Sequence, residues 1–294
     1  MKVLTNNIIV RKNMSNKKFF GLKYDSVFKN VFYRDEELLK KFLSDILSIY
    51  YDKSIIVKDV TLLNLELTKD RFYIKNKTVD IRVDIGDKII NCEINLSYDK
   101  ETEIRNFYYL TQALNESIKK GDNYVNIKDH IQFNFNFMGV KAQGIEESRY
   151  ENITTHTPKF KFIKTIDINV DYFMDTWYNS GKEKEYYEKF KSIIMFGLND
   201  NELKMLKDED DYMKKVKKEV LDLNQDPEFY QWLTDEEDRQ FLYNSRVIRY
   251  KCEGLEEGSK AKEIEIVRNM KEMNYPIEDI KKITGLSIEE IEKI

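Results

Sequence analysis

Residues 78–95, TVDIRVDIGDKIINCEIN, alternate between apolar and polar side chains on both sides of Gly86 and Asp87. Strict alternation is typical of a β-strand with one buried face, and glycine in the first central position suits a two-residue hairpin turn. In the register that this turn sets, Val83 faces Ile90, and the numbers of paired residues add up to 173. The register gathers the apolar side chains of both strands on one face, so the hairpin strongly constrains the fold.

The polar face of this hairpin brings two acids together, because the register places Asp80 opposite Glu93. Like charges in facing positions destabilise a sheet by up to about 1 kcal/mol. Arg82 on the same face is expected to offset this repulsion, and a divalent cation held by both carboxylates would offset it better. The alternative is a solvent-exposed face whose charges are simply hydrated, and the hairpin alone leaves both interpretations open. Asp84, farther along the strand, is expected to be hydrated.

Further alternation adds strands to this hairpin. Residues 131–140 alternate strictly, with an apolar residue at every second position, and strands are also expected at 59–67 and 162–170. Together with the helices, the predicted order is α, β, β, β, α, β, followed by one more strand. This order predicts an α/β fold with a mixed β-sheet, helices packed on the sheet and a helical C-terminal region.

Two helices are predicted around the hairpin from apolar residues at helical spacing. One covers residues 35–50 and follows a shorter aromatic segment at 24–32, in which Asp25 is a candidate helix cap. The other covers residues 101–121. One side of this second helix is lined by Ile104, Phe107, Thr111, Leu114 and Ile118.

Composition and charge divide the chain into four parts. Residues 1–20 form a basic N-terminal arm, 21–180 the core with the sheet, 181–270 a charged helical region and 271–294 a small helix-turn-helix-like tail. Residues 1–60 carry 12 Lys and Arg against 7 Asp and Glu. An anionic partner is therefore expected to meet the basic front of the chain.

The tail contains two short predicted helices. Pro276 starts the first helix, Gly285 ends it, and Ser287 with Glu290 forms a capping box for the second. The last helix carries three glutamates against one lysine, so phosphates would repel it. Packing or self-association is therefore favoured over the reading of DNA as the role of this tail.

Cysteine and histidine usage limits the metal chemistry that the chain can support. Cys92 and Cys252 form neither a metal motif nor a disulfide pattern, so reduced thiols and a cytoplasmic location are expected. The two histidines, His130 and His156, do not favour a zinc site, and neither has an evident partner as a general base. A metal would be held by carboxylates, which favours Mg²⁺ or Mn²⁺. No apolar run in the first 20 residues predicts a membrane segment, and no small-molecule cofactor is expected.

Several segments, in their order along the chain, resemble the PD-(D/E)XK nuclease superfamily. More closely, the chain is similar to the transposase branch that includes the recombination-promoting nucleases. The resemblance implies a restriction-endonuclease-like core, and it covers most of the chain. The segments that carry it are YDSVFKNVF (24–32), VDIRVDIGDKIINCEIN (79–95), RNFYYLTQ (105–112), KKGDNYVNIKDHIQFNF (119–135) and the charged helical segment 235–270.

The resemblance implies metal-dependent hydrolysis of phosphodiester bonds in DNA, in the service of recombination. By position, Asp80 and Glu93 would be the two catalytic acids, and both would hold Mg²⁺ or Mn²⁺. The third catalytic position is Asn95, where the superfamily has lysine and this branch often has glutamine. Asparagine carries no charge and is one methylene shorter than glutamine. This departure supports a second hypothesis, a catalytically inactive DNA- or protein-binding module, and a third is an interaction protein that works through its helical tail.

Two sets of residues are expected to contact DNA. The first set, Arg105, Tyr109 and Gln112, shares one helix face at spacings i, i+4 and i+7, and a solvated face is the alternative. The second set is the basic arm, which would hold the phosphate backbone without reading sequence. A homodimer is a further expectation for an enzyme that cuts both strands. The cations of the arm are Arg11, Lys12, Lys17 and Lys18.

Two more acids lie near the predicted site in sequence. Asp25 and Glu66 would each supply a further acid for a metal site, one from the first helix and one from the first strand. A helix cap for Asp25 and a surface position for Glu66 are the favoured alternatives.

Overall fold

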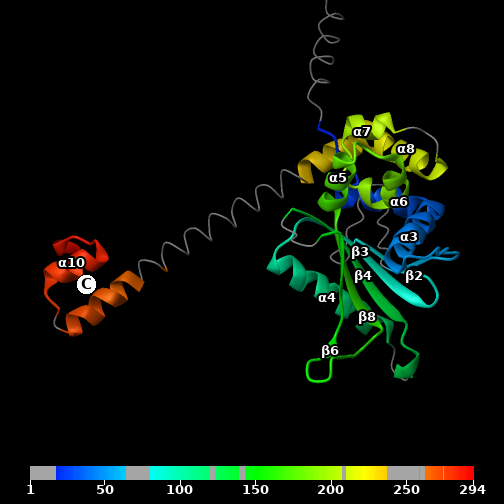
Figure 1. Cartoon of the computed structure of the whole chain (residues 1–294). Helices are drawn as coiled ribbons and strands as arrows, with labels where there is room; N and C mark the ends of the chain where they lie inside the picture. Colours follow the sequence, from blue (N-terminus) through cyan, green and yellow to red (C-terminus); the bar gives the residue numbers. More distant parts are fainter. Residues whose placement is uncertain are drawn as a thin grey trace, which may run out of the picture. The chain divides into compact units, whose positions relative to one another are not determined.

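The computed structural model describes residues 18–63, 80–118, 123–138, 143–206, 210–236, 258, 262–273 and 275–294. The chain divides into two compact units, Met1–Tyr230 and Gln231–Ile294. The first unit contains a six-stranded mixed sheet with helices packed against it (Figure 1). The predicted α/β class with a mixed sheet and C-terminal helices is therefore confirmed.

The sheet of the first unit has the strand order β1-β2-β3-β4-β8-β5. The pairs β3–β4 and β4–β8 are parallel, and the other pairs are antiparallel. Two short strands, β6 (Glu151–Asn152) and β7 (Thr157–Pro158), form a separate ribbon. The strands of the main sheet are β1 (Thr61–Leu62), β2 (Ile81–Asp84), β3 (Lys88–Ser97), β4 (Asp129–Met138), β5 (Ile145–Ser148) and β8 (Ile163–Asn169).

The hairpin of β2 and β3 has the register that the alternation predicts. Val83 pairs with Ile90, and Ile81 pairs with Cys92. Gly86 has φ +99°, a conformation that L side chains rarely adopt, so this turn position favours glycine. The strand predicted at 59–67 is described only as β1, because residues 64–67 lie outside the described residues.

The helices α2 (Asp25–Arg34) and α3 (Glu36–Tyr51) lie on the side of the sheet that carries its apolar face. Phe42 of α3 lies with its ring centroid 5.8 Å from that of Phe135 in β4, and Phe196 stacks on Phe135 at 4.7 Å. This aromatic cluster forms the centre of the core. The further helices of this unit are α5 (Val170–Asn179), α6 (Lys184–Ile194), α7 (Asp200–Met205) and α8 (Asp211–Gln225), and residues 227–230 at its end are also helical.

Both helix starts near the N-terminus depend on acids, but in different ways. Asp35 caps α3, because its side chain accepts hydrogen bonds from the backbone N–H groups of Glu37 and Leu38. The prediction that Asp25 caps the N-terminus of α2 is wrong. Tyr24 occupies the cap position of α2 without a side-chain cap bond, and Asp25 is the first helical residue. One position inside the helix, its carboxylate complements the helix dipole and remains available to other partners.

The opposite, polar face of the sheet lies under α4 (Lys100–Ser117), which contacts β3, β4 and β8 (Figure 1). The side chain of Asp99 caps this helix. Its buried residues are Thr102, Asn106, Leu110 and Ala113. The apolar side of the predicted helix instead includes exposed residues, since Ile104 is 62% exposed. The buried face of α4 therefore combines the polar Thr102 and Asn106 with the apolar Leu110 and Ala113.

The second unit has its own small core. Residues 262–272 are helical, and they are followed by α10 (Ile277–Thr284) and α11 (Ile288–Lys293). Gly285 ends α10 with φ +76°, and the predicted capping box of Ser287 and Glu290 is present. The core consists of Val267, Ile280 and Ile291. Within the part of the chain that the structure describes, no helix combines the length and apolar character needed to cross a membrane.

Phe42→Ala tests the aromatic core. Phe42 is fully buried and has Phe28, Phe32, Phe135 and Phe196 around its ring, so the truncation leaves a cavity. We expect the free energy of unfolding to fall by about 3–5 kcal/mol in urea titrations. The exposed Phe160→Ala serves as the control and should change stability little. A loss below about 1 kcal/mol for Phe42→Ala would contradict this description of the core.

Candidate active site

The two acids of the hairpin lie side by side and are tied to each other's strands. Asp80 directly precedes β2 and is 5% exposed, whereas Glu93 lies in β3 and is 6% exposed. The backbone N–H of Asp80 donates to Glu93 Oε2 at 2.9 Å, and the backbone N–H of Ile94 donates to Asp80 Oδ2 at 2.9 Å. One oxygen of each carboxylate is therefore held by backbone, which leaves Asp80 Oδ1 and Glu93 Oε1 for other partners.

Burial dominates the ionisation of this pair. Desolvation raises the pKa of Asp80, although the ammonium of Lys29 acts in the opposite direction. Desolvation also raises the pKa of Glu93 well above its usual value, and the neighbouring charge of Asp80 adds to the effect. Two carboxylates in a dry site resist simultaneous ionisation unless cations are close. A cation close to the pair therefore favours the ionised form of both carboxylates.

Lys29 of α2 is the cation that pairs with these acids, and the sequence analysis missed it. Its Nζ lies 2.8 Å from Asp80 Oδ1 and 3.3 Å from Asp25 Oδ2, and the residue is 4% exposed. Burial lowers the pKa of Lys29, but Asp80 and Asp25 outweigh it and the net pKa is raised. Lys29 is therefore a charged ammonium. Its position four residues after Asp25 is visible in the sequence, but its contact with a strand 51 residues later is not.

The expectation that Arg82 offsets the repulsion of the acids is wrong in its choice of residue. Arg82 forms an ion pair with Glu116 of α4, and its Nε donates to Asn91 Oδ1 at 3.1 Å. Lys29 occupies the offsetting position because α2 packs beside the start of β2. Tyr33 of the same helix donates its hydroxyl to the carbonyl of Asp80 at 2.8 Å. Helix α2 thus holds both the side chain and the backbone of this acid.

Asn95 is 2% exposed, and both polar atoms of its carboxamide have hydrogen-bond partners. Its Nδ2 donates to Asn136 Oδ1 at 2.8 Å, and its Oδ1 accepts from Arg105 Nη2 at 2.7 Å. These bonds orient the side chain toward the neighbouring strand and toward α4. The catalytic role predicted for Asn95 stays a prediction.

Asn95 belongs to a polar network that crosses β2, β3, β4 and β8 beneath α4. Its hydrogen bonds measure 2.7–3.1 Å. A solvated polar face, the alternative left open by the sequence, is excluded because these strand side chains are largely buried. The visible sign in the sequence is the run of amides that alternates with phenylalanines in β4. In order, the network contains Arg82, Asn91, Gln132, Asn134, Asp167, Asn136, Asn95 and Arg105.

The residues predicted to contact DNA are placed unevenly. Arg105 lies at the acids, with its Nη2 3.9 Å from Glu93 Oε1 and its side chain 48% exposed. Tyr109 is half-buried nearby, and its pKa is raised by burial and by the charge of Glu93. Gln112 donates to Glu116 Oε1 at 2.8 Å. Lys18 is exposed, with its Nζ 5.6 Å from the ring centroid of Phe20. Arg11, Lys12 and Lys17 lie outside the described residues.

The remaining candidates contribute little to the acid pair. His130 is buried with Nδ1 2.9 Å from the carbonyl oxygen of Lys128, and burial lowers its pKa. His156 is exposed beside Glu151. Asp25 pairs with Lys29, and its charge adds to the raised pKa of Asp80, whereas Glu66 lies outside the described residues.

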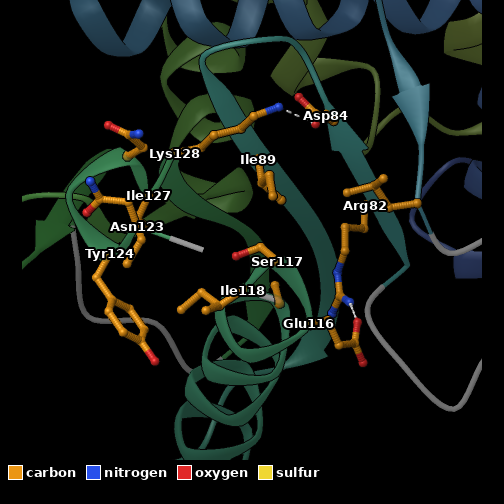
Figure 2. A pocket seen from close by; sticks show the side chains of 13 residues that line it. Arg82, Asp84, Ile89, Glu116, Ser117, Ile118, Asn123, Tyr124, Ile127 and Lys128 are labelled. Carbon is orange, nitrogen blue, oxygen red and sulfur yellow. Dashed lines mark hydrogen bonds and ion pairs between the residues drawn. The ribbon is translucent and has the colours of Figure 1, made fainter. Parts of the chain in front are cut away.

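A cavity of about 520 Å³ opens at the turn end of the hairpin, beside the C-terminal end of α4 (Figure 2). Two ion pairs line it: Arg82 with Glu116, and Lys128 with Asp84. Asp84, expected to be hydrated, is therefore half-buried and paired. Apolar side chains such as Ile118 complete the wall. The acid pair does not line this cavity, so the cavity and the acids are separate features of one polar face.

The acid pair suits a hard divalent cation. Among the described residues, no group of three or more His, Cys, Asp or Glu side chains could hold a metal. Mg²⁺, however, commonly takes only one or two protein carboxylates and completes its shell with water and substrate phosphates. Asp80 Oδ1 and Glu93 Oε1 are two such oxygen donors, and the residues therefore fit Mg²⁺ or Mn²⁺.

Comparison with protein families supplies the decisive observation. The model of the PD-(D/E)XK nuclease family transposase matches residues 22–249. The chain belongs to this family. No curated protein and no solved structure matches it. Membership thus supports a nuclease-type function, while α10 and α11 lie beyond the matched residues.

Glu93→Gln tests the raised pKa of this carboxyl. A group with a raised folded-state pKa stabilises the protein at low pH, and this stability is lost as the pH rises through the folded-state pKa. Gln imitates the protonated form, so at pH 8 the variant should exceed the wild type in unfolding free energy by at least about 1 kcal/mol. The gap should shrink as the pH falls toward 4.5, the ordinary pKa of glutamate. Urea titrations measure it, with the exposed Glu228→Gln as control; equal stabilities at pH 8 would contradict the prediction.

Asn136→Ala tests the polar network. The change leaves Asn95 Nδ2 buried without the acceptor that it has in the structure. An unsatisfied buried donor costs about 1–3 kcal/mol of stability, whereas the exposed Asn126→Ala should be nearly neutral. Chemical denaturation measures both variants. Equal stabilities would show that the network contributes no net stability.

Proposed function

We propose that this protein is a divalent-metal-dependent endonuclease that hydrolyses phosphodiester bonds in DNA and whose cuts promote recombination or transposition-like events. The observation that carries the proposal is the buried pair Asp80 and Glu93, which lie side by side at the start of β2 and on β3 and are tied together by backbone hydrogen bonds. A buried pair of like charges lowers the stability of the fold, and the binding of a metal ion would account for its presence.

The side chains around the pair suggest a division of roles. Asp80 and Glu93 would hold Mg²⁺ or Mn²⁺ through the oxygens that do not bond backbone N–H groups. The bound metal would supply a Lewis acid for the phosphate and a water of lowered pKa. Arg105 is half-exposed beside Glu93 and would contact a phosphate oxygen at the mouth of the site. The backbone bonds to both acids keep their carboxylates oriented before substrate arrives.

DNA would be held mainly through its phosphates. We propose Arg105, Tyr109 and Gln112 of α4 as contacts near the site, together with the basic arm Arg11, Lys12, Lys17 and Lys18. Binding of this kind weakens steeply as salt concentration rises. A homodimer would bring two such sites to the two strands of a duplex.

A second candidate function is a non-catalytic DNA-binding module on the nuclease fold. The observation that favours it is the asparagine at the lysine position of the family pattern. Asn95 is uncharged, and its amide is bonded to Asn136 and Arg105. A chain that had lost its chemistry could keep the fold and its affinity for phosphates.

Cleavage of supercoiled plasmid by the full chain, with Mg²⁺ or Mn²⁺ and with a chelator, separates the two functions. We expect nicked or linear DNA only with metal. Asp80→Asn and Glu93→Gln should each lower the rate by roughly 100-fold or more, the scale of losing one stabilising group in a hydrolytic site. Glu228→Gln is the matched acid-to-amide control, because it is exposed and lies on a helix outside the site.

Each outcome of this experiment corresponds to a different function of the protein. Absence of cleavage with salt-sensitive DNA binding intact would favour the non-catalytic module. Metal-dependent cleavage that survives both substitutions would show that the acids are not the site. Absence of both binding and cleavage would remove DNA as the partner.

A further inference from the structure

The superfamily pattern has a lysine two residues after the second acid, where this branch often has glutamine, and this chain has an uncharged asparagine there. Asn95 occupies the position, and its carboxamide is used by Asn136 and Arg105. A charge that stabilises developing negative charge on a phosphate is a major contributor to hydrolysis. The acid pair therefore needs a cation from elsewhere in the fold if it is to act in this way.

Lys29 lies where such a cation is needed, beside the first acid. Its Nζ lies 2.8 Å from Asp80 Oδ1, the oxygen that is not bonded to backbone. Electrostatic interaction links it to Glu93 as well as to Asp80. Arg105, the other nearby cation, is half-exposed, donates to Asn95 and lies 3.9 Å from Glu93 Oε1. Lys29 is thus the closer and more deeply buried charge.

Helix α2 holds Lys29 in place. The neighbouring residues Val27, Phe28, Val31 and Phe32 are fully buried in the core, so the helix cannot shift without disturbing that core. One turn after the lysine, Tyr33 donates its hydroxyl to the carbonyl of Asp80. Two side chains of one anchored helix therefore set the position of the ammonium relative to the first acid. Such preorganisation is what an electrostatic role requires.

We propose that Lys29 supplies, from a different element, the positive charge that the superfamily lysine gives to the acid pair, and that Asn95 serves as a structural residue. The catalytic part of this proposal rests on the proposed nuclease function. Lys29 is a positioning residue that acts through Asp80 and Glu93. Its charge opposes the binding of a divalent cation at the acids and, once metal and phosphate are bound, stabilises negative charge there. Removal of the charge should therefore change metal affinity and cleavage rate in opposite directions.

Lys29→Gln and Lys29→Arg of the full chain test this proposal. Gln keeps a hydrogen-bond donor for Asp80 but removes the charge, whereas Arg keeps the charge. Mn²⁺ alone is titrated by calorimetry at pH 8.5, and single-turnover cleavage of plasmid is measured at saturating Mn²⁺. Circular dichroism fixes a temperature at which all variants are folded. Lys29→Met, which adds no buried amide, serves as the neutral variant if Lys29→Gln does not fold.

We expect the neutral variant to bind Mn²⁺ roughly tenfold more tightly and to cleave roughly 100-fold more slowly. Lys29→Arg should stay close to the wild type in both measurements. Lys191→Gln is the matched control, because Lys191 is also a partly buried lysine that pairs with an aspartate, Asp210, on helices away from the acids. It should alter neither affinity nor rate.

Unchanged affinity and rate in the neutral variant would overturn the proposal and leave Lys29 a purely structural partner of Asp80. Weaker Mn²⁺ binding together with slower cleavage would also overturn it, since loss of site geometry gives that combination. If the wild type does not cleave DNA, the proposed nuclease function fails. The Mn²⁺ titration still tests the charge role of Lys29 in that case. Tighter Mn²⁺ binding by the neutral variant would then support the charge role of Lys29, and unchanged binding would refute it.

Discussion

The contact between Lys29 and Asp80 is the interaction on which the arrangement of the site depends. Two buried carboxylates on neighbouring strands would repel each other without compensation. The structure compensates them with two backbone N–H groups and with an ammonium brought by α2. The same helix buries its aromatic residues in the core, so core packing and site electrostatics are coupled through one element.

The sheet separates two kinds of chemistry on its two faces. One face meets the aromatic cluster around Phe135, where dispersion and burial dominate. The other carries a chain of hydrogen-bonded side chains from Arg82 to Arg105, with bonds within β4, between neighbouring strands and to α4. This network accounts for asparagine at position 95, since a lysine there would remove the bonds to Asn136 and Arg105.

Local pattern predicted a large part of this molecule. The hairpin register, the alternating strand β4, the apolar residues of α3 and the capping box of the tail all follow from neighbours in sequence, and the structure confirms them. The facing of Asp80 and Glu93 followed from the same register. Two of the wrong predictions share one cause: Arg82 as the offsetting cation and Asp84 as hydrated both depend on what packs above the hairpin.

The sequence by itself determined which residues share a face of the hairpin, and it carries the family match, because alternation and motif order are local properties. Only the tertiary structure decided that the polar face is buried under α4, because coverage depends on where a distant helix docks. Only it decided that Lys29 meets Asp80, across 51 residues of chain. Burial increases the free-energy cost of an unpaired charge, so the stability of the site depends on which partners the fold brings to each charged group.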